Sequence, residues 1–216
     1  MTARALALAL GLAACGPLVA VGAPKGPPPA RHLLSSPPVA GVPADGAVAE
    51  AVTVLGPLAP AALQTPRIPV RLAGTEVRYL VGHQWAEPPA RLFMRLLAEH
   101  LVASGVPVLD RRLAGRGAAR QLGGELSAFG VEAGPPPRVR VRFEATLLDP
   151  GGLRQRRFQA ERPIVRIEGP EVAAALDEAA QQVAREVAAW VRQHRHGTEP
   201  AGAVAGAGIE PATSGL

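Results

Sequence analysis

The segment RVRVRFEATLLD, residues 138–149, limits the possible folds more than any other part of the chain. Apolar and polar side chains alternate along its whole length. The apolar positions are Val139, Val141, Phe143, Ala145 and Leu147. A period of two residues predicts a strand that turns one face to a core and the other to water.

Two hairpins are predicted from turn residues that separate strand-like segments. Gly and Pro in PGG, residues 150–152, predict a tight turn, after which LRQRRFQAERPIV returns antiparallel to 138–149. Gly74 and Thr75 separate RIPVRLA from EVRYLV and predict a second hairpin. Pro69 lacks a backbone N–H, so we expect the first strand of that hairpin to lie at a sheet edge.

Weaker strand patterns are found in four further segments, 32–34, 48–58, 106–110 and 120–132. The glycines within the last of these suggest a β-bulge in that strand.

Two segments have the period of an amphipathic helix instead. In 87–105 the apolar residues recur at helical spacing, with prolines in the first turn and a glycine at the end. A longer helix is predicted from residue 169 to Gly197, with an apolar stripe that runs from Val172 to Val191. Strands and helices in this order predict an α+β fold, a two-layer sandwich in which two amphipathic helices cover one face of a mostly antiparallel sheet.

The positive charge of the chain does not indicate a nucleic-acid partner. The formal net charge is +5, but Lys25 is the only lysine and the arginines are spread along the chain. No basic run is interleaved with aromatic residues, which argues against nucleic-acid binding. An arginine-rich face could still meet acidic lipid headgroups or an acidic protein.

The single cysteine, Cys15, follows an uncharged run from Ala5 to Ala14 that Arg4 precedes. The run is too short to span a bilayer and fits the apolar region of a signal peptide. The four residues LAAC resemble the lipobox of bacterial lipoproteins, in which a diacylglyceryl group is attached to the cysteine. The alternative is that Cys15 is a small apolar residue within a cleaved signal. The residue after the cysteine is Gly16 and not an aspartate, which resembles the pattern that sorts lipoproteins to the outer membrane.

These features divide the chain into four parts. We expect a lipoprotein signal peptide at 1–14, a lipidated N-terminus and Pro/Gly-rich tether at 15–47, and an α+β domain at 48–195. The residues from 196–216 are small and polar without periodicity, which predicts a disordered tail.

The sequence has no motif for catalysis, cofactor binding or metal binding. It lacks a G-x-S-x-G elbow, a phosphate-binding loop and a Cys/His zinc spacing, so we predict a protein that is not an enzyme and has no cofactor. His100 lies on an apolar helix face, where a hydrogen-bonded core histidine is favoured over a general base. HRHG at 194–197 is interpreted as a helix-end cap rather than a metal site. Trp85 either packs over the following helix or contacts a partner.

The pattern of the whole chain resembles the ABC-type transport auxiliary lipoproteins, the PqiC-like group, over about residues 30–193. That family usually has an aromatic residue where His32 stands. The segments that carry the resemblance are LAAC at 12–15, the run 63–105 with Tyr79 and WAEP at 85–88, RVRVRFEATLLD, and EVAAWV at 186–191.

The resemblance implies a periplasmic lipoprotein that is anchored to the outer membrane through Cys15. Such proteins work beside an ABC transporter and its substrate-binding protein of the mammalian-cell-entry type, in the transport of lipids or hydrophobic solutes. Two alternatives are a lipoprotein that aids assembly of another outer-membrane machine and a secreted hydrolase, although no nucleophile–base pair supports the hydrolase. A homo-oligomer is left open.

Overall fold

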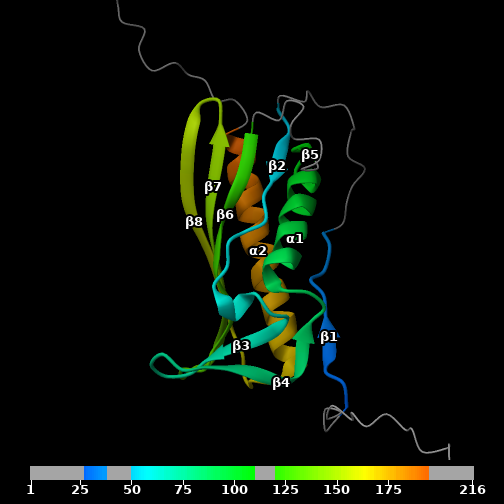
Figure 1. The fold of residues 1–216 in the computed structure, drawn as a ribbon, viewed down its shortest axis with the longest axis vertical. Helices are drawn as coiled ribbons and strands as arrows, with labels where there is room; N and C mark the ends of the chain where they lie inside the picture. The colour runs from blue at the N-terminus through cyan, green and yellow to red at the C-terminus, as the bar shows by residue number, and fades with distance from the viewer. Residues whose placement is uncertain (1–26, 38–49, 110–119, 195–216) are drawn as a thin grey trace, which may run out of the picture.

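The computed structural model describes residues 27–37, 50–109 and 120–194 (Figure 1). The predicted signal peptide, Cys15 and the predicted C-terminal tail lie outside these residues. Within the described ranges, neither helix is long and apolar enough to cross a membrane.

The described residues form a mixed α/β domain with one open sheet of eight strands and two α-helices. The helices are α1 (Pro89–Ala103) and α2 (Gly169–Gln193), with a short 3₁₀ helix, η2 (Ala61–Leu63). The strands are β1 (Ala30–His32), β2 (Val52–Val54), β3 (Arg67–Arg71), β4 (Val77–Trp85), β5 (Val108–Leu109), β6 (Arg120–Glu132), β7 (Arg138–Asp149) and β8 (Gly152–Pro163).

Strand β6 is the centre of the sheet. On one edge it pairs antiparallel with β7, which in turn pairs antiparallel with β8. On the other edge it pairs parallel with β2 at one end and with β3 at the other. Strand β5 is added beside β2, and β4 and then β1 are added beside β3.

The sheet is mixed, so the prediction of a mostly antiparallel sheet is wrong. Among the described strands, four pairs are parallel and three are antiparallel. The antiparallel pairs include the two predicted hairpins, β3–β4 and β7–β8, which tight turns make visible in the sequence. The parallel pairs join short strands that are far apart in the chain, and hydrophobic periodicity carries no signal for the direction of such pairs.

Pro69 does not lie at the sheet edge that its missing N–H predicts. Strand β3 has neighbours on both sides, β4 and β6. The sheet accommodates the proline because the β3–β4 register shifts between Arg67 and Pro69, and pairing with β6 begins only at Val70. A proline at such an irregularity costs no ladder hydrogen bond.

Strand β6 has the bulge that its sequence suggests, but the glycines do not form it. Gly123 and Gly124 pair in regular register with Thr146 and Ala145 of β7. The register shifts instead between Leu126 and Ala128. Gly124 is required for another reason, since its φ is +142° and a Cβ atom there would collide with the backbone carbonyl of Glu144.

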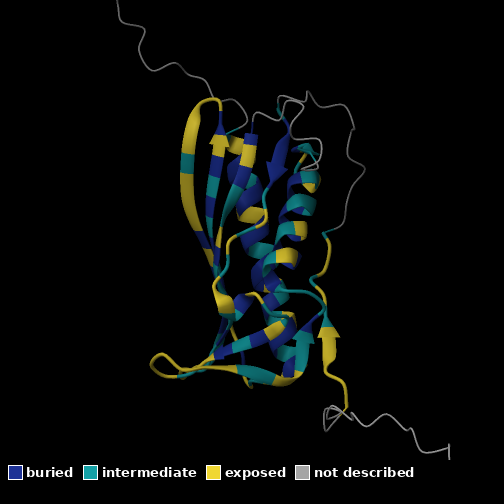
Figure 2. Ribbon diagram, in the orientation of Figure 1, coloured by how far each residue is buried: buried dark blue, intermediate teal, exposed yellow. Residues whose placement is uncertain are grey.

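The core lies between the apolar faces of the long strands and the helices. The alternation predicted for β7 is confirmed, because its odd-numbered residues from Val139 to Leu147 are buried. Phe143 of β7 contacts Phe93 of α1, and Phe158 of β8 contacts Trp190 of α2. Figure 2 shows that β8 is exposed over much of its length. These contacts agree with helices that share one face of the sheet, which stays a prediction.

Candidate functional site

Trp85 is a core residue and not a surface contact. Its exposed fraction is 0%, its ring meets Phe129 edge to face at 5.4 Å, and it approaches the ring of His32 at 6.2 Å. Burial of the whole side chain favours the packing role of Trp85, and contact with a partner stays a prediction. Trp85 belongs to the hydrophobic core, and β1 pairs beside the end of β4 with His32 opposite Trp85.

The folded domain begins earlier than the predicted boundary at residue 48. Strand β1 pairs parallel with β4, and after it Ser35 donates its backbone N–H and its hydroxyl to the carboxylate of Asp177 on α2, at 2.9 and 2.5 Å. Gln181 on the same helix donates to the carbonyl of Ser35. Residues 30–35 therefore belong to the domain and not to the tether.

Two histidines join β1 to β4. Their rings are stacked with centroids 5.3 Å apart, and Nε2 of His32 lies 3.0 Å from Nδ1 of His83, so one ring donates a hydrogen bond to the other. His32 thus places a flat ring beside Trp85. Burial and, after it, the charge of His83 hold the pKa of His32 below its usual range.

His100 is a hydrogen-bonded core histidine, as predicted. Its exposed fraction is 6%, and its Nε2 donates to the side-chain oxygen of Gln181 at 2.6 Å. Burial lowers the pKa of His100, and the nearby charge of Arg185 adds to this, against opposing effects of the Gln181 hydrogen bond and Glu99. His100 therefore joins α1 to the residue of α2 that holds Ser35.

We expect the domain to lose stability as the pH falls below about 6.5. Because the pKa values of His32 and His100 are lowered by folding, the unfolded chain binds protons first, and its greater proton uptake destabilises the fold. Urea unfolding between pH 7.5 and 5.5 measures this slope. His32→Phe keeps a ring beside Trp85 and should flatten the slope, whereas an unchanged slope would contradict the assignment.

Helix α2 ends at Gln193, before the predicted end at Gly197, and His194 is its C-cap residue. Its Nδ1 donates to the carbonyl of Trp190 at 2.7 Å, and its ring lies against the Trp190 ring. The remaining residues of the HRHG motif lie outside the described ranges. Where the structure describes the chain, no three His, Cys, Asp or Glu side chains gather as a metal site requires.

A surface hollow lies beside β6. It is located where the segment between Leu58 and Val70, which follows one edge of β6, bends away from the sheet. Leu58 bridges to Glu125 and Val70 pairs with Val131, so 12 residues of chain (70 − 58) accompany only 6 residues of β6 (131 − 125). The surplus residues loop outward through η2. Pairing along this edge of β6 therefore stops between Leu126 and Val131, which is also where the bulge lies.

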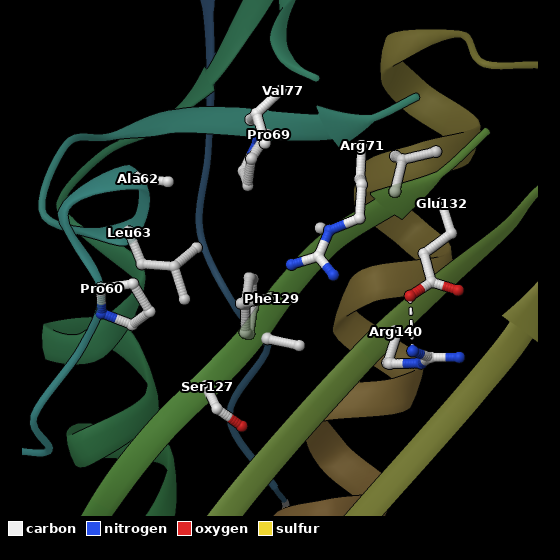
Figure 3. A pocket seen from close by; sticks show the side chains of 13 residues that line it. Pro60, Ala62, Leu63, Pro69, Arg71, Val77, Ser127, Phe129, Glu132 and Arg140 are labelled. Carbon is white, nitrogen blue, oxygen red and sulfur yellow. Dashed lines mark ion pairs between the residues drawn. The ribbon is translucent and has the colours of Figure 1, made fainter. Parts of the chain in front are cut away.

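The hollow is apolar at its base and charged at its rim (Figure 3). It has a volume of about 80 Å³. Arg71, from β3, extends its guanidinium over the hollow, as Figure 3 shows. The lining includes Pro60, Ala62 and Leu63 of the η2 region, Pro69 and Val77 of the β3–β4 hairpin, and Ser127 to Val131 of β6.

Two polar groups at the hollow have no partner. Among the described residues, the guanidinium of Arg71 makes neither an ion pair nor a hydrogen bond. The hydroxyl of Ser127, at the bulge, is buried without a hydrogen-bond partner. A buried hydroxyl such as that of Ser127 usually has a partner in folded proteins, whereas the exposed Arg71 guanidinium is open to water.

The other charges at the rim neutralise one another. Glu132 forms ion pairs with Arg140 at 2.5 Å and with Arg138 at 2.9 Å, and both arginines also reach Glu161 on β8. Arg71 therefore provides the uncompensated charge at this site. The hollow was not predicted from the sequence, in which the only signal for it is a phase change within 120–132.

The described residues form a mixed α/β domain with a small hollow that is apolar at its base and charged at its rim. The chain belongs to the family of ABC-type transport auxiliary lipoprotein components, whose model matches residues 32–188. The family resemblance predicted from the sequence is thus confirmed. No curated protein matches the sequence significantly.

Solved structures share the fold at low identity. A DUF330-family protein from Xanthomonas campestris is 23% identical, with a TM-score of 0.64, over 76% of this chain and 98% of that protein. An uncharacterized protein is 18% identical, with a TM-score of 0.60, over 78% of this chain and 99% of its own. PelC from Paraburkholderia phytofirmans, a dodecamer, is 15% identical, with a TM-score of only 0.37, over 68% of this chain and 93% of PelC.

Proposed function

We propose that the protein is a periplasmic lipoprotein, anchored to the outer membrane, that serves as a non-enzymatic auxiliary component of an ABC-type transporter. Membership of the auxiliary lipoprotein family over residues 32–188 carries this proposal. The transporter is of the mammalian-cell-entry type and moves lipids or hydrophobic solutes, as the family resemblance implies.

The anchor is Cys15, at the end of LAAC. One acyl chain binds a membrane only marginally, whereas two or more anchor a protein stably, so a diacylglyceryl group at Cys15 would hold the chain at the membrane. The first strand begins at Ala30, 15 residues later (30 − 15). At full extension those residues reach at most roughly 50 Å, which limits how far the domain can stand from the membrane.

Cys15→Ala is expected to release nearly all of the protein from the membrane fraction, because it removes the only thiol that can carry a lipid. Fractionation of cells and labelling with radioactive palmitate measure the effect. Gly16→Ala keeps the thiol and should retain both label and membrane association. Equal labelling and equal fractionation of the Cys15→Ala variant would show that the anchor is misassigned.

Co-purification tests the proposed machine. From membranes solubilised in detergent, the protein should bring down a mammalian-cell-entry protein together with an ABC ATPase and permease. Recovery of components of a different outer-membrane assembly instead would favour the alternative, an assembly lipoprotein. Light scattering of the purified protein measures whether the chain forms a homo-oligomer.

A further inference from the structure

The size of the hollow beside β6 restricts what it can hold. Sites for small molecules usually enclose about 300–1,000 Å³. The hollow, at about 80 Å³, is well below that range and cannot enclose a lipid chain. It is large enough for a group the size of one side chain, since one water occupies about 30 Å³.

The residues that line the hollow favour an apolar group over a polar one. Pro60, Ala62, Pro69 and Ala128 present carbon atoms, so an apolar side chain placed among them would exchange water for apolar contacts. Small pockets that receive one apolar anchor are typical energetic centres of protein interfaces. The base of the hollow therefore favours an aliphatic side chain from another protein.

The charge of Arg71 adds a second requirement. Its guanidinium has no partner among the described residues, while Arg138 and Arg140 are neutralised by Glu132 and Glu161. Because the guanidinium lies over the hollow, a carboxylate beside the apolar anchor would reach it (Figure 3). A guanidinium and a carboxylate form charge-assisted hydrogen bonds.

We propose that this hollow, formed where the chain leaves the edge of β6 between Leu126 and Val131, binds a leucine-like side chain next to an aspartate or glutamate in an exposed segment of a partner protein. This inference rests on the proposed function, because the partner that provides the segment is a component of the transporter. Arg71 binds the carboxylate, and the η2 region and Ala128 surround the apolar group.

Peptide titrations of the purified full-length protein, followed by amide NMR, test this inference. The probe is acetyl-Ser-Leu-Asp-Ser-amide, with two matched peptides that replace Leu by Ser or Asp by Asn. We expect the probe to shift the resonances of Ala62, Ala128 and Gly130. Loss of the leucine should weaken binding about tenfold or more, and loss of the carboxylate about threefold, as is usual for a buried aliphatic group and an exposed ion pair.

Three variants assign the effects to residues. Arg71→Gln should bind the Asp and Asn peptides equally, whereas Arg142→Gln, on the same sheet face but outside the hollow, should keep the threefold difference. Ala128→Leu should fill the hollow and abolish binding. Arg71 is exposed, so its test of charge stands even where Ala128→Leu fails to fold.

Three results would overturn the inference. The first is that the peptide shifts amide resonances elsewhere on the domain, and the second is that Arg71→Gln still prefers the Asp peptide to the Asn peptide. The third is that decanoate shifts the resonances of the hollow at a lower concentration than the peptide does, which would make the hollow a lipid site. The titrations use purified protein without transporter components. If no peptide binds, the inference about the hollow fails, whereas the proposed function is tested by membrane fractionation and co-purification.

Discussion

Replacing Trp85 with alanine is expected to lower the free energy of unfolding by about 3–5 kcal/mol, the usual cost of truncating a buried tryptophan. The indole is fully buried, and its ring contacts Phe129 of the central strand and His32 of β1. A cavity there would weaken the contact between the first strand and the core. Because the free energy of unfolding of a domain is about 5–15 kcal/mol, such a loss removes much of its stability. Urea unfolding at pH 7.5 measures it.

Trp85→Phe is the matched control. Phenylalanine keeps a ring against Phe129, and the indole N–H that it removes has no hydrogen-bond partner, so the loss should be much smaller. If Trp85→Ala kept the wild-type stability while binding of the transporter components was lost, Trp85 would be a partner contact after all.

The elements of the fold could be predicted from local pattern, but the sheet order could not. The alternation in 138–149, the turn at 150–152 and the helical spacing in 87–105 each depend on neighbouring residues, and each corresponds to an element of the structure. The parallel pairing of β6 with β2 and β3 depends on residues 68 (120 − 52) and 61 (131 − 70) positions apart. Propensity and periodicity carry no information about such pairs.

The burial of Trp85 was missed for the same reason. Its position before Pro88 and Pro89 suggests the surface end of a strand. The residues that contact it are far away in the sequence: Phe129 of β6, and His32 of β1, a strand of three residues that follows three prolines and has little pattern of its own.

The hollow did have one local signal. In 120–132 the buried residues Leu122 and Leu126 are even-numbered, whereas Phe129 and Val131 are odd-numbered. A change of phase within one strand indicates a bulge, and bulges often lie next to functional sites. The gap in pairing beside it required the structure, because it depends on how many residues lie between the contacts of Leu58 and Val70 with β6.

The second large effect is expected for Gly124→Ala, in the middle of β6. The φ of Gly124 is +142°, a value that side chains with a Cβ rarely adopt, and a Cβ there would meet the carbonyl oxygen of Glu144 on β7. Strained backbone alone costs about 1–3 kcal/mol, and the collision must also push apart the longest pair of strands, so we expect a loss of about 3 kcal/mol or more.

Gly134→Ala, in the loop between β6 and β7, provides the comparison for that variant. No atom lies within 4 Å of a Cβ built at Gly134, and its φ is not positive, so alanine there should leave stability unchanged or raise it by about 0.4–1 kcal/mol. Urea unfolding of both variants at pH 7.5 separates the effect of the site from that of losing a glycine. Equal stabilities would mean that β6 and β7 do not approach each other as closely at Gly124 as the pairing with Ala145 requires.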